Sequence, residues 1–440
     1  MFVTSHFLVF KARYAQNKLP NMIDINLVLN SKEMVLENNK RRKADVDATE
    51  VLRLSVERTP LMASVQELRT RANDIASRIP KASSDERASL VEEGRSIKEE
   101  VKELEANLST IETSLETELK KFPNILREDV PVGQSEDDNV VERIVGTPRE
   151  FSFEPKDHLE LGEKLGMIDM DRASKVSGAR FVYLKGDAVL LEFALVQYAL
   201  RTLAAHDFVP VIPPHIISTE AMDAMGYLEH GGEEEIYHLK HDDAVLIGTS
   251  EQAIGPMLMN EIIDLSKGPL RYVGFSPCYR REAGSYGRDT RGILRVHQFD
   301  KIEMFSFTLP EESDKEHLLL LSLEEELMNG LGLPYRVVKL CSADLGRPSA
   351  RTFDIETWMP SQKTYRETHS TSNTTDYQTR RLKTRFKRDG KTELAHALNG
   401  TAFAIGRIMI AIMENFQEAD GSIIVPEVLR AYVGKDKLSV

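Results

Sequence analysis

Cysteine is scarce in this sequence of 440 residues, which contains only Cys278 and Cys341. Two cysteines cannot build the disulfide framework of a small secreted fold, so their number indicates a reducing compartment. No cysteine–histidine cluster has zinc-binding spacing, and we expect no structural zinc. Long apolar runs are also missing, which excludes an integral membrane protein. A hydrophobic content of 41% nevertheless excludes disorder throughout the chain.

An excess of positive charge is missing as well. Lysine and arginine number 57 against 70 aspartates and glutamates, which gives a formal net charge of −13. A protein that coats nucleic acid without specificity needs dense positive charge, so this balance argues against that class and leaves a local basic site open. The common glycine-rich phosphate loops, the nucleophile elbow and the metalloprotease helix are absent. A nucleotide bound to this chain would therefore be held by side chains.

The length predicts about two or three domains, and a short basic extension precedes them. Residues 1–21 contain basic residues and no acidic ones. We interpret them as a disordered tail, or as an untranslated leader before Met22, with an organellar transit peptide as the alternative. Together with the cysteine content, this interpretation predicts a cytoplasmic protein.

The most regular pattern of the sequence is a pair of apolar repeats. Apolar residues recur at steps of three and four over 51–79 and again over 90–119, which is typical of a coiled-coil seam. Arg58 occupies one seam position, and Pro60 is expected to kink the first helix. A turn signal at 80–85 separates the two runs. The pattern predicts an antiparallel two-helix arm about 45 Å long, with a dimerisation coiled coil or a spacer as the alternative.

The arm belongs to a first domain at 22–125, and the chain changes character after it. Residues 126–149 are acidic and turn-rich, which predicts a linker. From 150 to 440, short β-prone runs alternate with helices without a βαβ rhythm, so we expect an α+β domain with an antiparallel sheet and flanking helices. The predicted strands lie at 180–184, 209–212, 244–248, 272–275 and 301–305.

Charged residues concentrate in a strand–loop–strand segment at 271–305. Arginine side chains can bind phosphates bidentately, and a nearby acid can accept a hydrogen bond from an amino group on a base or an amine. A solvated charged hairpin is the alternative interpretation. The charged residues that we single out there are Arg280, Arg281, Glu282, Arg288, Asp289, Arg291, Arg295, Asp300 and Glu303.

Two further segments carry candidate chemistry. The polar run 364–375 contains Glu367 and Ser370, a carboxylate and a hydroxyl that suit Mg²⁺ bound mainly through substrate phosphates. A Ser/Thr-rich turn is the alternative there. Arg407 lies on an apolar helix that follows Asn399-Gly400-Thr401, and an arginine in such surroundings must be paired or bind an anion.

These segments together resemble the seryl-tRNA synthetase family of class II aminoacyl-tRNA synthetases, from about residue 22 to the C-terminus. The helix around 190–205, followed by Val211-Ile212-Pro213-Pro214, corresponds to the first motif of the class. The resemblance implies a class II antiparallel sheet with flanking helices, preceded by a tRNA-binding arm. The most specific matches are Gly248-Thr249-Ser250-Glu251, Tyr279-Arg280-Arg281-Glu282, Arg295-Val296-His297-Gln298-Phe299, and Asn399-Gly400-Thr401 with Arg407.

The resemblance implies that ATP activates L-serine to seryl-adenylate and that serine then passes to the 3′ end of tRNA(Ser). By motif position, Arg280 would bind the α-phosphate and Arg407 the far phosphates, as the catalytic residues. The other implied ATP-binding residues are Arg281, Glu282, Val296, Phe299, Glu367, Thr368, His369 and Ser370, with Glu282 at the adenine amino group, Phe299 against the adenine ring, and Glu367 and Ser370 as Mg²⁺ ligands. The implied serine-binding residues are Thr249, Glu251, Glu303, Asn399 and Thr401. The implied tRNA contacts near the tip of the arm are Arg69, Arg71, Arg78, Lys81, Arg87 and Arg95.

The sequence departs from the usual family pattern at a few of these positions. After Glu367 it has Thr-His-Ser-Thr-Ser-Asn, where Ser-Ser-Cys-Ser-Asn is usual, and Thr401 stands where serine is common. A side-chain hydroxyl is kept at Ser370 and at Thr401. The class assignment is unaffected, and the departures concern the finer contacts to serine.

Two other functions compete with this interpretation. A synthetase-like paralog that charges a non-tRNA carrier is the main alternative, and the long arm argues against it. A non-catalytic RNA-binding or scaffold protein would have no need of Arg280, Glu282 and Arg407 together. The class resemblance also implies a homodimer, and whether tRNA(Sec) is a further substrate stays open.

Overall fold

The structure, a computed structural model, describes residues 23–229, 232–283 and 291–440. The predicted extension 1–21, and Arg288 and Asp289 of the charged loop, lie outside these ranges. Internal contacts divide the chain into an arm unit (residues 1–40 and 44–123) and a body unit (residues 41–43 and 124–440). The helices of the arm unit are α1 (Ile25–Asn30), α2 (Lys32–Arg41), α3 (Thr49–Arg78) and α4 (Ser84–Lys120).

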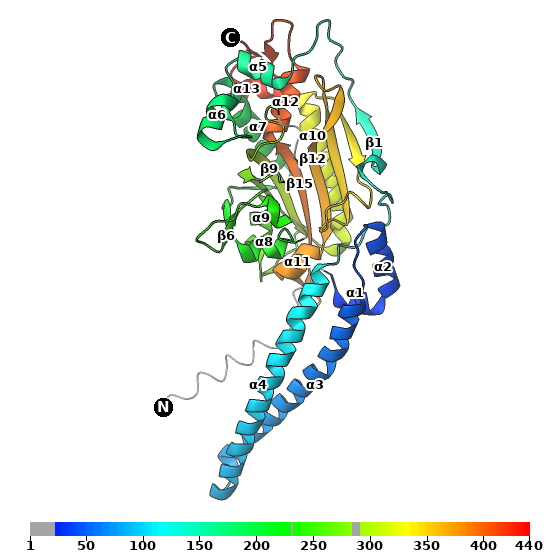
Figure 1. The fold of residues 1–440 in the computed structure, drawn as a ribbon, viewed down its shortest axis with the longest axis vertical. Helices are drawn as coiled ribbons and strands as arrows, with labels where there is room; N and C mark the ends of the chain where they lie inside the picture. Colours follow the sequence, from blue (N-terminus) through cyan, green and yellow to red (C-terminus); the bar gives the residue numbers. More distant parts are fainter. Residues whose placement is uncertain (1–22, 230–231, 284–290) are drawn as a thin grey trace. The chain divides into compact units, whose positions relative to one another are not determined.

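Helices α3 and α4 pack against each other along the predicted seam (Figure 1). Near the turn between them, Ile75 of α3 forms a buried cluster with Leu90 and Ile97 of α4. Helix α4 begins with a capping box, in which Ser83 and Glu86 satisfy each other's backbone N–H groups. The two-helix arm predicted from the apolar repeat is therefore confirmed.

The irregular seam positions have local explanations. Arg58 forms an ion pair with Glu112 across the two helices at 2.7 Å, and the two side chains are only 16% and 17% exposed. The arginine therefore occupies an apolar position because an acid on the facing helix neutralises it. Helix α3 runs from Thr49 to Arg78 through Pro60, which removes one backbone hydrogen bond while the helix continues.

The body unit is built on an eight-stranded sheet with the order β1-β10-β11-β12-β15-β9-β8-β4. Neighbouring strands are antiparallel except for the pair β4–β8, so the predicted α+β class with an antiparallel sheet is confirmed. The strands are β1 (Val140–Val145), β4 (Val209–Val211), β8 (Leu270–Tyr279), β9 (Gln298–Thr308), β10 (Tyr335–Lys339), β11 (Arg351–Met359), β12 (Thr364–Thr375) and β15 (His396–Ala404).

Part of the segment predicted to be a linker is an edge strand of this sheet. Val140–Val145 forms β1 and pairs with β10, although most of its side chains are exposed. An exposed edge strand buries little apolar surface, so it has no strong apolar alternation by which the sequence could reveal it. The linker prediction is therefore wrong for these residues.

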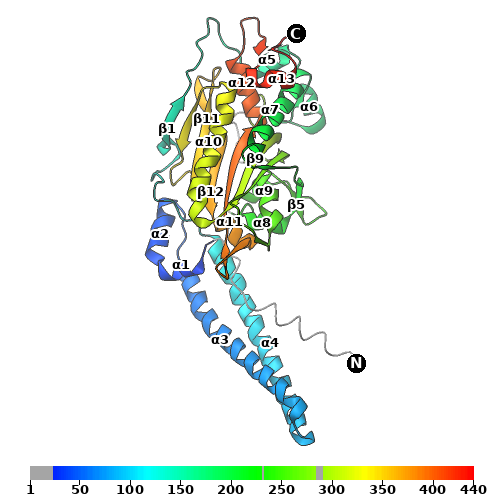
Figure 2. The same cartoon turned by 180° about the vertical axis from the view of Figure 1, so that it is seen from behind.

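Helices cover the sheet, and α10 lies along one face of it in Figure 2. Further strands form small separate sheets around it. The helices of the body are α5 (His158–Lys164), α6 (Met170–Ser177), α7 (Asp187–Ala204), α8 (Thr219–Met225), α9 (Glu251–Ile254), α10 (Ser313–Leu331), α11 (Tyr377–Leu382), α12 (Ile405–Asn415) and α13 (Glu427–Val433). The strands of the small sheets are β2 (Ile168–Asp169), β3 (Tyr183–Leu184), β5 (Ile216–Ser218), β6 (Ala244–Leu246), β7 (Ile262–Ile263), β13 (Arg385–Arg388), β14 (Lys391–Leu394), β16 (Ile423–Ile424) and β17 (Lys437–Leu438).

The alternation of strand β9 divides the body into two apolar cores. Ile302 and Met304 pack in the large core with helices α7, α10 and α12. Phe305 and Phe307 pack in a second core with α8, α9 and α11. Since successive side chains of a strand point to opposite faces, Glu303 belongs to the same face as Phe305.

One buried acid of the body unit, on helix α7, is uncharged at neutral pH. Glu192 of α7 is 9% exposed. Its burial, a hydrogen bond to Asp300 and the charge of that aspartate raise the pKa of Glu192 from about 4.5 to about 9. The folded protein therefore holds a proton here that the unfolded chain releases over this interval, so the free energy of unfolding decreases as pH rises from about 4.5 to about 9.

We predict that Glu192→Gln weakens this loss of stability at rising pH, because the amide imitates the protonated acid and has no proton to lose. The measurement is the free energy of unfolding in urea at pH values across this window. The variant should unfold at higher urea than the parent at the alkaline end and change little at the acid end. Glu220→Gln, at an exposed position of α8, is the control, and an unchanged pH slope in Glu192→Gln would contradict the prediction.

Candidate active site

A cleft in the body unit brings together side chains from four separate segments of the chain. Arg280 follows β8, Phe299 lies on β9, Glu367 on β12 and Arg407 on α12. The predicted site residues that line it are Arg280, Glu282, Val296, Phe299, Glu367, Thr368, Thr401 and Arg407. The predicted residues outside its lining are Thr249, Glu251, Arg281, Glu303, His369, Ser370 and Asn399.

Strand β9 contributes to this cleft through alternate residues. Phe299, Lys301 and Glu303 share one face of the strand, and the guanidinium of Arg280 lies 5.3 Å from the centre of the Phe299 ring. Arg280 Nε also donates a hydrogen bond to the carbonyl of Gly248 at 3.2 Å. The cation is thus fixed beside an aromatic face, which suits a planar base and its phosphates.

The charge pair between Glu282 and Arg295 is also fixed. Glu282 accepts a hydrogen bond from Arg295 at 2.9 Å. The backbone of Glu282 has a φ of 51°, in the left-handed region that non-glycine residues rarely adopt. Such strain is typical of functional sites. Arg281 is exposed, and its N–H donates to the carbonyl of Glu235.

Buried carboxylates lie next to the cleft. Glu303 is 1% exposed; it forms an ion pair with Lys301 and accepts a hydrogen bond from Thr401 at 3.2 Å. Glu251 is held by the Tyr227 hydroxyl. Burial, followed by the charge of Glu303, raises the pKa of Glu251. Two carboxylates and a threonine hydroxyl are therefore available to one small polar ligand.

Glu367 and Arg407 form a second charged pair in the cleft. The Arg407 guanidinium donates to the Glu367 carbonyl at 2.8 Å and lies 3.3 Å from its carboxylate. Protein atoms around Glu367 disfavour its ionised form, but the charges of Arg407 and Arg280 outweigh that effect and lower its pKa. The Glu367 side chain still has 52% of its surface exposed, so an ionised carboxylate is open to the cleft.

A β-bulge places Ser370 on the same face as Glu367. On a regular strand, residues three apart would point to opposite faces. The register of β12 shifts here, so that Glu367 lies opposite Glu356 of β11 and Ser370 lies opposite Asp354. Because Glu356 and Asp354 are two residues apart on β11, their partners share a face. The carboxylate and the hydroxyl are therefore presented together.

The same register turns His369 away from the cleft. His369 lies opposite Ile355, is 1% exposed and packs against Phe403 with ring centres 5.9 Å apart. Burial lowers the pKa of this imidazole to about 3, so it is neutral. The prediction that the His369 side chain contacts ATP is therefore wrong. Its Nδ1 instead pairs with the Thr368 hydroxyl at 2.9 Å.

Sequence reasoning missed two residues of this region. Lys301 lines the cleft, and Tyr227 holds Glu251. Lys301 could have been found, because it alternates with Glu303 on the predicted strand 301–305. Tyr227 left no such signal, because it lies far from Glu251 in the sequence and meets it only through the fold.

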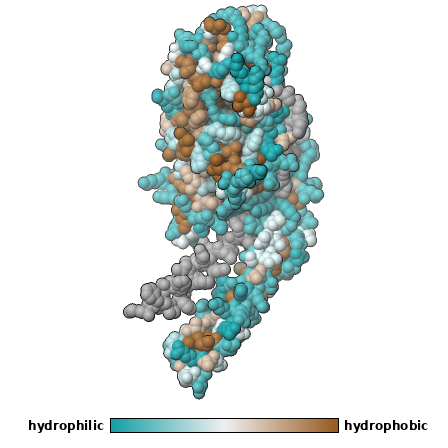
Figure 3. Space-filling view, turned by 60° about the vertical axis from the view of Figure 1, so that its left-hand side comes forward, coloured by the Kyte–Doolittle hydropathy of each residue, from teal (hydrophilic) through white to brown (hydrophobic). Residues whose placement is uncertain are grey.

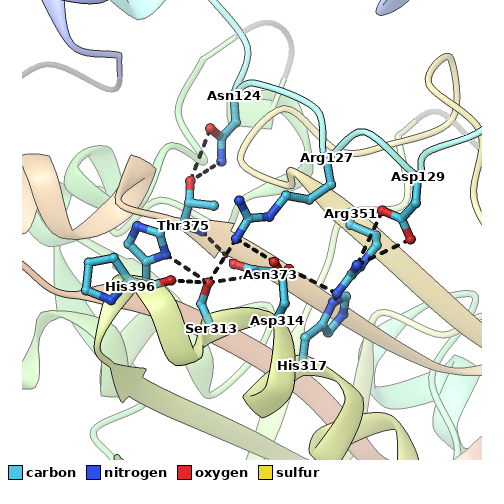
Figure 4. A network of polar contacts seen from close by, with 11 residues as sticks. Asn124, Arg127, Asp129, Ser313, Asp314, His317, Arg351, Asn373, Thr375 and His396 are labelled. Carbon is cyan, nitrogen blue, oxygen red and sulfur yellow. Dashed lines mark hydrogen bonds and ion pairs between the residues drawn. The ribbon is translucent and has the colours of Figure 1, made fainter.

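A network of polar contacts supports the strands of the site (Figure 4). It includes Asn124, Arg127 and Asp129, which lie where the main segment of the body unit begins. Arg351 on β11 contacts Asp129 at 3.3 Å and Asp314 at 3.1 Å, and its Nε donates to His317 Nδ1. With that nitrogen occupied, His317 Nε2 donates to the Thr371 carbonyl at 3.0 Å. Burial lowers the pKa of His317 to about 3, so the ring stays neutral.

Asn124 closes the network at its other end. Its amide group donates to the carbonyls of Pro348 and Thr374, at 2.7 and 2.8 Å, and to the Thr375 hydroxyl at 3.0 Å. The network thus fixes β12, which carries Glu367 and Ser370.

The basic residues predicted at the tip of the arm are largely paired with acids of the arm itself. Arg69 contacts Glu105 at 2.6 Å and Arg71 contacts Glu93 at 2.5 Å. Arg78 and Arg95 form longer pairs with acids on their own helices. Within the described part of the arm, no ion pair forms at Lys81 or Arg87. The exposed pairs among them, such as Arg71–Glu93, contribute little to stability, and their acids can be exchanged for other anions.

The described residues hold no candidate for a membrane span or a dedicated metal cage. No helix in the described ranges is long and apolar enough to cross a bilayer. The same ranges contain no group of three or more His, Cys, Asp or Glu residues placed to hold a metal ion.

Family comparisons agree with this geometry. Residues 236–416 match the model described as the tRNA synthetase class II core domain (G, H, P, S and T), so the body unit contains the core domain of a class II aminoacyl-tRNA synthetase. Residues 22–126 match the seryl-tRNA synthetase N-terminal domain. A serine–tRNA ligase from Corynebacterium efficiens is 46% identical over 422 residues, which are 95% of this chain and 99% of the relative. The chain belongs to the seryl-tRNA synthetase family.

Solved structures agree with that assignment. The seryl-tRNA synthetase from Pyrococcus horikoshii, crystallised with ATP, aligns with a TM-score of 0.86 at 38% identity and covers 94% of this chain and 99% of its own. The cytoplasmic serine–tRNA ligase from Naegleria fowleri, in complex with AMP, aligns with a TM-score of 0.82 at 33% identity, over 94% of this chain and 98% of its own.

We predict that Asn124→Ala lowers the free energy of unfolding by about 1–3 kcal/mol, because it leaves buried carbonyls without donors. Urea unfolding, followed by circular dichroism, measures the change. Asn107→Ala, at an exposed position of α4, should change the stability far less. Equal stability of the two variants would show that the amide of Asn124 does not support the network.

Proposed function

We propose that this chain activates L-serine with ATP to form seryl-adenylate and transfers serine to the 3′ end of tRNA(Ser). The observation that carries the proposal is the cleft in which Arg280, Phe299, Glu367 and Arg407 meet next to the buried pair Glu303–Thr401. The family membership and the ATP and AMP complexes of the two relatives support the choice of nucleotide.

The nucleotide contacts follow from the chemistry of the cleft. Arg280 would bind the α-phosphate and Arg407 the far phosphates, because guanidinium groups bind phosphate oxygens bidentately. Phe299 would stack against the adenine, and the carboxylate of Glu282 would accept from its amino group. Val296 and Thr368 also line the cleft.

The serine contacts would come from Thr249, Glu251, Glu303, Asn399 and Thr401. A serine ammonium favours a site with carboxylates, and its hydroxyl needs a partner in a buried place. Alanine would leave those partners unpaired, which is a severe penalty, while threonine would lack room for its methyl group. The hydrogen bond between Thr401 and Glu303 fixes two of these groups relative to each other.

Glu367 and Ser370 fit an Mg²⁺ ion bound together with ATP. They offer hard oxygen donors on one strand face, which suits an ion held mainly by water and phosphates. Ser370 is hydrogen-bonded to Asp354, and its hydroxyl oxygen has lone pairs that can bind a cation. The ion would neutralise phosphate charge.

No general base is needed for the first step. The carboxylate of serine is the nucleophile at the α-phosphate and is already ionised at neutral pH. The carboxylate oxygen forms the new bond to phosphorus while the bond to pyrophosphate breaks. The chain therefore acts by aligning the two substrates and by stabilising charge through Arg280 and Arg407.

The arm is the proposed contact to tRNA. Its tip carries Arg69, Arg71, Arg78, Lys81, Arg87 and Arg95, and phosphates can replace the exposed acids that pair with several of them. A paralog that charges a small carrier would have no use for this arm.

A second copy of the chain is the proposed partner of one apolar face. Figure 3 shows apolar patches on the surface of the body. Exposed apolar side chains lie on α7 and just after β4, where Phe193 is 52% and Ile212 80% exposed. These elements correspond to the first motif of the class, and exposed apolar patches typically mark interaction sites. We propose a homodimer through this face.

Arg280→Ala should nearly abolish serine-dependent exchange of pyrophosphate into ATP, because the charge that develops on the α-phosphate loses its partner. We expect the rate to fall by at least about a hundredfold. Arg388→Ala, which removes a partly exposed arginine that pairs with Glu311, is the matched control. Near-normal exchange in Arg280→Ala would overturn the assigned role.

Deleting residues 54–116 and joining the ends by a short loop should spare adenylate formation and impair tRNA charging. The cleft lies within the body unit, so it stays intact without the arm. The two activities are measured as pyrophosphate exchange and as attachment of labelled serine to tRNA. Unimpaired charging by the shortened chain would show that the arm is not the tRNA module.

A further inference from the structure

A buried histidine lies behind the wall of the nucleotide cleft and has no part in the chemistry described so far. His158, the first residue of α5, is 5% exposed. Its Nε2 accepts a hydrogen bond from the backbone N–H of Ile293 at 3.1 Å. Its Nδ1 lies 3.3 Å from Glu414 Oε1.

Glu414 fixes which ring nitrogen of His158 carries the hydrogen. A carboxylate beside Nδ1 accepts the N–H of that nitrogen, which leaves a lone pair on Nε2 for the Ile293 N–H. Glu414 is fully buried, and its second oxygen accepts the N–H of Ser361 at 3.0 Å. Glu414 lies on α12, two turns after Arg407, so one helix both binds in the cleft and orients the histidine.

The backbone of the cleft wall lies close against the imidazole. Gly292 has a φ of 73°, and a Cβ atom at this position would lie 2.0 Å from His158 Nε2. Any other residue would therefore collide with the ring and adopt a strained backbone conformation. Helix α12 also approaches this backbone, because the Ile293 carbonyl lies 3.6 Å from the point where a Cβ atom at Gly406 would be. The hydrogen bond from the Ile293 N–H to His158 therefore anchors the backbone where it comes close to α12.

The residues that follow line the cleft that binds the nucleotide in the proposed function. Ile293 and Leu294 line the cleft, and so does Arg295, which pairs with Glu282. We propose that His158, oriented by Glu414, is a positioning residue that fixes the 292–295 backbone and thereby the adenine-binding wall of the cleft. This inference rests on the proposed function, since it assigns a part in ATP binding.

The test compares His158→Phe with His158→Gln in ATP–pyrophosphate exchange. Phenylalanine keeps the ring and removes the acceptor, so the Ile293 N–H is left unsatisfied. We expect the KM for ATP to rise by about tenfold, with kcat and the KM for serine changing by less than about threefold. Glutamine carries an amide oxygen that can reach the same N–H, and it should restore most of the ATP affinity.

The control is Leu429→Ala, which removes a buried side chain of α13 outside the cleft lining. It should lower the melting temperature and leave the KM for ATP unchanged. If His158→Phe behaves like this control, or if His158→Gln raises the KM for ATP as much as His158→Phe does, the histidine only fills space and the inference is wrong. Should His158→Phe fail to fold, Glu414→Gln is measured instead, and an unchanged KM for ATP would contradict the inference.

These outcomes are separate from those of the proposed function. The parent protein must catalyse serine-dependent exchange for the proposed function to stand. The inference about His158 depends only on how the variants differ from that parent.

Discussion

The antiparallel register between β9 and β15 is the constraint on which the site depends. It sets Thr401 opposite Glu303 and, through the alternation of β9, directs Phe299 and Lys301 to the same face. Further along the strand, Phe305 and Phe307 bury that face in a core. A slip by one residue would send the Glu303 carboxylate into the large apolar core and bring Met304 to the substrate. Because an unpaired buried carboxylate is very unfavourable, the packing that stabilises the sheet also fixes the chemistry.

The second constraint is a departure from regularity. The bulge in β12 turns a spacing of three residues into a shared face for Glu367 and Ser370, and it sends His369 into the core. The polar network from Asn124 to His317 holds the same strand through its backbone carbonyls. Neutral and paired groups in that network place no uncompensated charge behind the site. The β9–β15 register thus arranges the proposed serine contacts, and the bulge in β12 arranges the proposed metal ligands.

Much of this could be predicted from the sequence, and the limits have physical causes. The arm left a long periodic pattern, and the sequence motifs pointed to Arg280, Glu282, Phe299, Glu367 and Arg407, which do meet in the cleft. Strand β1 was not predicted, because an exposed edge strand lacks apolar alternation. The orientation of His369 depends on the bulge in β12, which no pattern in the local sequence predicts. Tyr227 and His158 act through tertiary contacts with Glu251 and Ile293, which are distant in sequence.

The central claim is that the cleft activates serine. The most direct measurement is ATP–pyrophosphate exchange by the intact chain with each of the standard amino acids in turn, followed by transfer of the activated amino acid to tRNA. The account predicts that the exchange depends on serine and that its rate is far lower with alanine or threonine. It also predicts serine-charged tRNA(Ser) as the product. Exchange that depends on a different amino acid, or serine-dependent exchange without any transfer to tRNA, would contradict it.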